Sequence, residues 1–196
     1  MLEPHAAKLD PGKKVTWSPV ARRIRVPLGF VLAVFYLWRA HPAWPFFVAG
    51  AVIVGVGVFV RTMASGQVKK NQELTQTGPY QYVRNPLYLG SIIIATGFGV
   101  AARDLWIAVI LLLMFVLVYV PVIRSEESFL RSRFPEYDDY ARRVPCLLPR
   151  KFQLSGFAAG FSRQLYLRHR EYNTMLGAAA MLAALVVKIL WFSRTT

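Results

Sequence analysis

Cysteine and histidine are scarce in this sequence, and their scarcity argues against several kinds of site. The single cysteine, Cys146, has no partner for an intramolecular disulfide or for a cysteine-based zinc site. The histidines His5, His41 and His169 are scattered without the spacing of metal ligands. We therefore expect no metal centre. No glycine-rich loop follows a strand pattern, as a soluble dinucleotide-binding fold requires, and no serine, histidine and aspartate arrangement indicates a triad.

Acidic residues are also few, since 10 aspartates and glutamates stand against 24 lysines and arginines, for a net charge of +14. Such an excess is typical of proteins that contact nucleic acid, anionic lipid or a membrane surface. Here the basic residues flank apolar runs instead of interleaving with aromatic residues. We interpret the charge as membrane topology and headgroup contact, and we expect no nucleic-acid partner.

Long apolar runs make up much of the chain. Hydrophobic residues account for 55% of it, above the roughly 45–50% that is usual for soluble domains. A helix that crosses a bilayer needs about 20 such residues, and the first of the runs falls short of that length. The runs are Val26–Trp38, Ala43–Val60, Pro86–Ala102, Leu105–Ile123 and Asn173–Phe192. They predict an all-α integral membrane protein with about five transmembrane helices, forming one domain over residues 1–196.

Short features within the runs predict how the helices meet. Ala51 and Gly55 have the spacing that lets membrane helices approach closely. Arg103 and Asp104 form a link so short that the helices on either side must be an antiparallel hairpin.

Loop charges predict the orientation, because cytoplasmic loops carry the excess of lysine and arginine. With the N-terminus inside, residues 61–85 hold four basic residues and residues 124–172 hold ten, whereas the outer loops hold Arg39 and Arg103 only. We expect a cytoplasmic N-terminus, an external C-terminus and a functional site on the cytoplasmic side.

The stretch from Thr77 to Gly90 is the most distinctive in the chain. Asn85 precedes Pro86, a pair that favours a capped helix start. With Arg84, the same helix start would also make a binding site for an anion. The three tyrosines of this stretch fit either an interfacial belt or the wall of a site; they are Tyr80, Tyr82 and Tyr88.

Glu126 and Glu127 lie just past the fourth run, where a helix end would favour cations. Either the helix continues to about Phe134, with Glu127 paired to Arg131, or the glutamates bind a cationic or hydroxyl-rich ligand. Arg142 and Arg143 are equally open: they fit the positive-inside pattern, or they hold a carboxylate or phosphate. Residues 150–172 mix aromatics with arginines, as a headgroup-bound segment or a plain connector would.

In combination, these motifs resemble the isoprenylcysteine carboxyl methyltransferases and the related membrane phospholipid methyltransferases. The resemblance covers residues 77–149 and rests on Gly78-Pro79-Tyr80, on Arg84 to Gly90, on Glu126-Glu127, on Tyr137 and Tyr140, and on Arg143-Val144-Pro145. One departure is that Asn85 stands where most members have histidine. The last helix lies outside the resemblance.

The resemblance implies a cytoplasm-facing pocket for S-adenosylmethionine, which a lipidic acceptor reaches from the bilayer. The resemblance also implies that Arg143 would orient the acceptor and that Glu127 is a candidate catalytic residue. The cofactor would contact Tyr82, Arg84, Asn85, Tyr88, Gly90, Glu126 and Glu127.

The function expected from this resemblance is methyl transfer to a membrane acceptor, which is a lipid headgroup or the carboxylate of a lipidic or prenylated molecule. Two other functions remain open. A membrane reductase of the sterol type would bind NADPH in the corresponding region, although two carboxylates suit a sulfonium better than phosphates. A lipid-binding membrane protein would have no catalytic activity at all.

Overall fold

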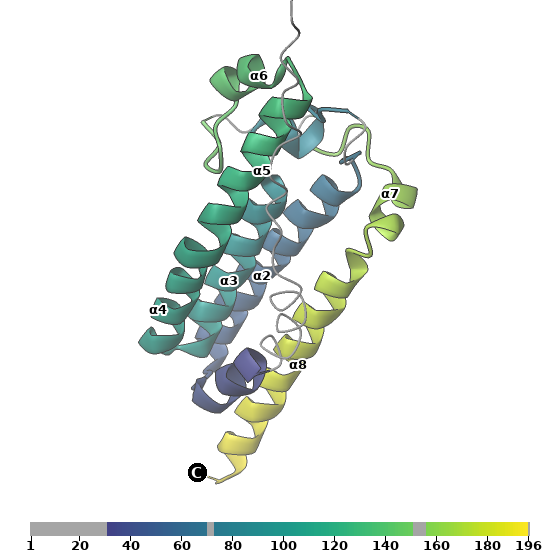
Figure 1. Cartoon of the computed structure of the whole chain (residues 1–196). Coiled ribbons are helices and arrows are strands. Elements are labelled where there is room, and N and C mark those ends of the chain that lie inside the picture. The colour runs from purple at the N-terminus through teal and green to yellow at the C-terminus, as the bar shows by residue number, and fades with distance from the viewer. Residues whose placement is uncertain (1–30, 70–72, 151–155, 196) are drawn as a thin grey trace, which may run out of the picture.

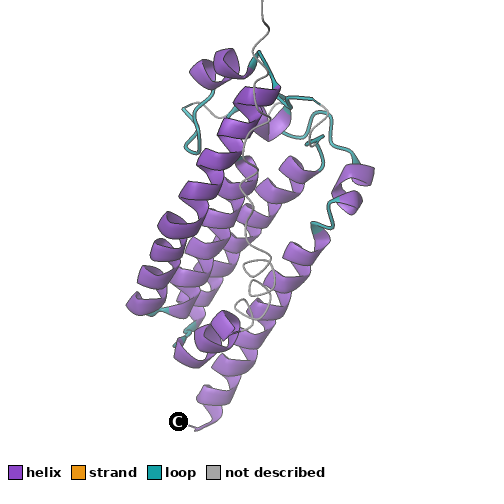
Figure 2. Cartoon of the chain, in the orientation of Figure 1, coloured by secondary structure: helices purple, strands orange, loops and turns teal. Residues whose placement is uncertain are grey.

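The computed structural model describes residues 31–69, 73–150 and 156–195, and these residues form helices and loops without a strand (Figure 2). The long helices are α2 (Trp44–Ser65), α3 (Pro86–Ala102), the continuous run of α4 (Leu105–Met114), η2 (Phe115–Tyr119) and α5 (Val120–Arg133), and α8 (Tyr172–Thr195). Short helices are η1 (Gly78–Gln81), α6 (Tyr137–Arg143) and α7 (Arg163–Arg168). Residues 31–39 form a further helix.

Among the described residues, three helices are long and apolar enough to cross a membrane: Trp44–Ser65, Leu105–Arg133 and Tyr172–Ser193. The predicted all-helical membrane fold is confirmed to this extent. Pro86–Ala102 has the predicted bounds but is shorter. The first predicted span is described only from residue 31 onward, so the count of five spans stays a prediction.

Helices α2 and α3 lie side by side at the centre of the bundle (Figure 1), and glycines bring their backbones into contact. A Cβ at Gly57 would lie 2.8 Å from the carbonyl oxygen of Gly90, and one at Gly50 would lie 2.5 Å from that of Gly97. The expected contact through Ala51 and Gly55 is not found between the described helices, because a Cβ at Gly55 would meet none of the described residues within 4 Å. The chain uses the neighbouring face of α2.

The predicted hairpin between α3 and α4 is present. Arg103 adopts a left-handed conformation that turns the chain, and the Asp104 carboxylate accepts a bond from the backbone of Ile107 to cap α4. Arg39 forms an ion pair with Asp104 at 2.6 Å, which joins the hairpin to the 31–39 helix. Partial burial opposes ionisation of Asp104, but the backbone bond and the Arg39 charge outweigh it and lower the pKa of this carboxyl.

The fourth helical run passes through a π-helical turn and continues beyond the predicted end at Ile123. Pro121 lacks an N–H and its ring crowds the carbonyl four residues earlier. The wide turn of η2, which directly precedes α5, accommodates this proline. Glu126 and Glu127 therefore lie on a helix that extends to Arg133, not in a loop.

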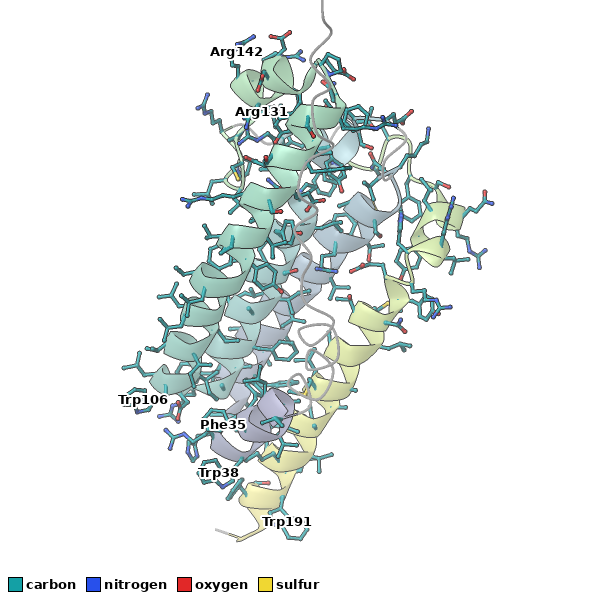
Figure 3. All side chains as sticks on the ribbon, in the orientation of Figure 1. Phe35, Trp38, Trp106, Arg131, Arg142 and Trp191 are labelled. Carbon is teal, nitrogen blue, oxygen red and sulfur yellow. The ribbon has the colours of Figure 1, made fainter. Side chains whose placement is uncertain are left out.

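The two ends of the bundle differ in their side chains. Figure 3 shows Trp38, Trp106 and Trp191 near one end, whereas Arg131 and Arg142 lie at the end that carries α6. The three tryptophans are exposed, as aromatic side chains at a membrane interface are. At the tryptophan end a small core joins the 31–39 helix to α3, α4 and α8 through Tyr36, Ala40, Ala101, Ala102, Ile107 and Leu185.

We predict that Gly57→Ala destabilises the protein by about 1–3 kcal/mol, because the added methyl group separates α2 from α3. Gly55→Ala is the matched control, since it makes the same change two residues away at an open position. Unfolding of the purified protein in detergent measures both variants. Equal stability of the two would contradict the glycine contact.

Candidate functional site

A cavity of about 420 Å³ lies where α2 ends and α3 begins, and α5 closes one side of it. Its volume is within the range of small-molecule sites. Apolar side chains such as Leu87 and Phe129 alternate with polar ones around the wall. The polar lining consists of Arg61, Lys69, Glu73, Thr75, Tyr80, Arg84, Asn85, Tyr88, Ser91, Tyr119, Glu126 and Tyr140.

The predicted site residues divide into two groups by position. Those that line the cavity are Arg84, Asn85, Tyr88 and Glu126; those outside its lining are Tyr82, Gly90, Glu127 and Arg143. Tyr82 stacks on Phe157 with the ring centres 6.2 Å apart. Gly90 faces α2. The exposed Arg143 donates to the Asp139 backbone and to Gln76.

Glu127 is held directly behind the cavity wall. Its Oε1 accepts from Arg84 Nη2 at 3.0 Å and from Asn85 Nδ2 at 3.1 Å. The expected pairing of Glu127 with Arg131 is wrong, because Arg131 bonds Asp138 instead. Asn85 does occupy the N-cap position of α3, yet its side chain caps no backbone group and is used for Glu127.

The chain after α6 returns to this cluster and fixes it from the other side. The backbone N–H of Arg84 donates to the carbonyl of Pro145 at 2.9 Å, and that of Asn85 donates to Cys146 at 3.2 Å. The Arg84 side chain also reaches the carbonyl of Ala141. Residues 141–146 thereby hold Arg84 and Asn85, directly before the start of α3, in place.

Two tyrosines dock α6 onto this base. The Tyr140 hydroxyl donates to the carbonyl of Tyr80 at 2.7 Å in a buried position. The Tyr137 hydroxyl is buried near Glu127 and has no hydrogen-bond partner among the described residues. Burial, with the Glu127 charge second, raises the pKa of Tyr137 to about 12. Burial also raises the pKa of the Cys146 thiol, which disfavours a nucleophilic thiolate there.

Glu126 has a different environment from its neighbour. Its Oε2 accepts from the Tyr88 hydroxyl at 2.8 Å, and the Tyr88 ring packs edge-on against Tyr119 with the centres 5.7 Å apart. Residues adjacent on an α-helix point about 100° apart. Because Glu127 is fixed on Arg84, Glu126 is directed to the cavity side of α5.

Ion pairs neutralise the cations of the cavity one by one. Arg61 pairs with Glu171, Lys69 with Glu73 and Arg84 with Glu127. Glu126 is then the one acidic residue of the lining without a cationic partner in the part of the chain that the structure describes. The site therefore carries one uncompensated negative charge.

Sequence reasoning missed several residues of this site, among them Arg61, Tyr119 and Glu171. Arg61 was visible only as the cation that closes the second apolar run, and Tyr119 only as one apolar position of the fourth. Glu171 is 110 positions from its partner Arg61. No short-range pattern indicates such a pair.

Comparison with known proteins supports the class of protein that the sequence motifs indicate. Residues 45–137 match the model of the phospholipid methyltransferase family. This match confirms the resemblance to membrane methyltransferases that the motifs indicate.

Two relatives are described by a physiological role. The nickel-cobalt-cadmium resistance protein NccN of Alcaligenes xylosoxydans xylosoxydans is 39% identical over 123 residues, which cover 58% of this chain and 58% of that protein. The cobalt-zinc-cadmium resistance protein CzcN of Cupriavidus metallidurans is 35% identical over 135 residues, which cover 64% of this chain and 62% of that protein. The chain thus spans less than two thirds of either relative. No solved structure matches the chain.

We predict that Tyr140→Phe lowers the free energy of unfolding by about 1–3 kcal/mol, because it leaves the buried Tyr80 carbonyl without its donor. Tyr137→Phe removes a buried hydroxyl that has no well-formed hydrogen bond among the described residues, so it should cost less. Chemical denaturation in detergent compares the two variants. A larger loss for Tyr137→Phe would contradict this account of the docking.

Proposed function

We propose that the protein is a membrane methyltransferase that uses S-adenosylmethionine and acts on a lipidic acceptor. The observation that carries the proposal is the uncompensated carboxylate of Glu126 in a cavity whose cations are all paired. A cavity with this charge favours a cationic ligand, and the methyl donor is a sulfonium cation. The family match over residues 45–137 supports the same chemistry.

The residues present fit such a cofactor. Glu126 would face the sulfonium, and the rings of Tyr88 and Tyr119 offer the aromatic faces that attract cations. Bound S-adenosylmethionine would supply an activated methyl group. The protein's own task is then to align the acceptor, exclude water and balance charge. An acceptor that must first lose a proton would find a base in Glu126.

The role of Glu127 changes in this proposal. Its carboxylate is engaged by Arg84 and Asn85, so we assign it to holding the start of α3 and not to proton transfer. Arg84 and Asn85 both bond this carboxylate, so we assign a structural task to them as well. An amide donor serves that task as an imidazole N–H would, so asparagine in place of histidine is compatible with activity.

The charges of the cavity favour the methyl donor over NADPH. A dinucleotide carries several phosphate charges, yet Arg61, Lys69 and Arg84 each share their charge with an acidic partner, so together they cannot offset that many negative charges. A purely lipid-binding protein would need no cation-selective cavity. Both alternatives would give no stabilisation by S-adenosylmethionine.

We place the site on the cytoplasmic side of the membrane. The cavity lies at the end of the bundle with α6 and the arginines, and the exposed tryptophans lie at the other end (Figure 3). The excess of basic residues at the cavity end supports this orientation.

The names of the relatives concern metal resistance, and the proposal links this role to a modified membrane component. Within the described ranges, no three His, Cys, Asp or Glu side chains are grouped as metal ligands. The proposal therefore includes no metal site.

We predict that Glu126→Gln weakens binding of S-adenosylmethionine by about tenfold, equivalent to about 1.4 kcal/mol. The loss for S-adenosylhomocysteine should be much smaller, because its sulfur is neutral. Calorimetry on the purified protein in detergent measures both ligands.

The matched control is Glu136→Gln, which removes the same charge from an exposed glutamate outside the cavity. It should leave both affinities unchanged. An equal loss of both ligands in Glu126→Gln would remove Glu126 from the sulfonium. Failure of the wild type to bind either ligand at millimolar concentration would overturn the proposed function.

A further inference from the structure

Arg61 is the cation that α2 contributes to the lining of the cavity, and its hydrogen bonds leave one nitrogen of its guanidinium available. Nε pairs with the Glu171 carboxylate, and Nη1 donates to Ser91 and to the carbonyl of Leu87. Nη2 has no acceptor among the described residues. A guanidinium fixed on one edge with free N–H donors on the other is suited to an anionic group.

The neighbouring elements are shaped to hold Arg61 in this position. A Cβ at Gly90 would lie 2.5 Å from Arg61 Cγ, so glycine is what lets the side chain cross α3. Glu171 belongs to the turn between α7 and α8, outside the stretch that matches the family. Contacts at Ser65 and Gly66, the residues at the end of α2, hold this turn in place through His169 and Ser162.

A second cavity, of about 460 Å³, adjoins the polar one inside the membrane region. It lies between α3 and the α4 to η2 run and is lined almost wholly by apolar side chains. Ser91 and Tyr119 line both cavities, so the two cavities are neighbours at these residues. We call this second, apolar cavity the groove. Since Arg61 bonds Ser91, its guanidinium lies between the polar cavity and the groove.

We propose that Arg61, held in place by Glu171, is the residue that binds the anionic group of an amphiphilic acceptor whose hydrocarbon chain occupies the groove. Glu171 is a positioning residue that fixes the guanidinium for this contact. This inference rests on the proposed function, because it assigns the residues that bind the acceptor at the same site. It gives Arg61 the acceptor-orienting task that the motif pattern implied for Arg143.

The arrangement separates the two ligands along α3. Tyr88, which bonds Glu126, is one helical turn before Ser91, which bonds Arg61. The Glu126 end of the cavity is therefore nearer the start of α3, and the Arg61 end is nearer the apolar groove. An acceptor whose hydrocarbon chain occupies the groove would meet Arg61 before Glu126.

Binding of three amphiphiles with the same oleoyl chain tests the inference. Oleate presents a carboxylate, oleoyl lysophosphatidic acid presents a phosphate, and monoolein is uncharged. We expect the wild type to prefer at least one anionic probe over monoolein. Arg61→Gln should reduce that preference by about tenfold, because it removes the charged contact to the anion. It should leave monoolein binding intact, because Arg61 is not among the residues that line the groove.

The control variant is Arg124→Gln, which removes a cation from exposed surface outside both cavities. It should keep the wild-type preference. The probe that loses more affinity in Arg61→Gln identifies the anion as carboxylate or phosphate. An unchanged preference in Arg61→Gln, or no anionic preference in the wild type, would overturn the inference.

Glu171 is tested by two variants that a merely electrostatic role would not separate. Glu171→Gln keeps an oxygen for Arg61 Nε and should retain the anionic preference, whereas Glu171→Ala should lose it. An equal effect of both variants would reject positioning. Binding of S-adenosylhomocysteine, measured on all variants, should stay unchanged; a loss confined to this ligand would assign Arg61 to the cofactor and overturn the inference while leaving the proposed function standing.

Discussion

The double hydrogen bond that Glu127 accepts from Arg84 and Asn85 is the interaction on which the site depends. It joins α5 to the start of α3, and the backbone bonds of residues 84 and 85 add the chain at 145 and 146 to the same point. The pair is mostly shielded, with side-chain exposures of 15% and 17%. Removing one partner would leave a poorly solvated charge, so the cluster holds as a unit. Its position determines where Glu126 points.

Adjacent glutamates can thus have unlike tasks on one helix. Glu127 is neutralised within the protein, whereas Glu126 accepts only from Tyr88 among the described residues and keeps its charge. The family motif names both residues, but only the three-dimensional pairing tells the structural carboxylate from the one that faces the cavity. The same reasoning applies to asparagine at position 85, whose amide supplies the N–H donor that Glu127 needs.

Much of the fold is predictable because hydropathy reports helices directly: the α3 bounds and the hairpin at Arg103 and Asp104 agree with the structure. The end of the fourth run was harder to place, because charged residues stop the hydropathy signal at Ile123 but do not stop the helix. The contact face of α2 was also beyond the sequence, since Gly55 and Gly57 are equally small and only packing distinguishes them. For the site, the sequence motifs correctly named four residues that line the polar cavity: Arg84, Asn85, Tyr88 and Glu126. Arg61 and Glu171 escaped because their pairing depends on the path of a distant C-terminal segment.

The central claim is that the protein transfers a methyl group to a membrane lipid at the polar cavity. Transfer of a radiolabelled methyl group tests this claim most directly. Membranes containing the protein are incubated with S-adenosylmethionine that carries tritium in its methyl group, and the organic extract is counted. The account predicts label in the lipid fraction with the wild type and a large reduction with Glu126→Gln at the same protein level. Equal lipid labelling with the wild type, with Glu126→Gln and with membranes lacking the protein would contradict it.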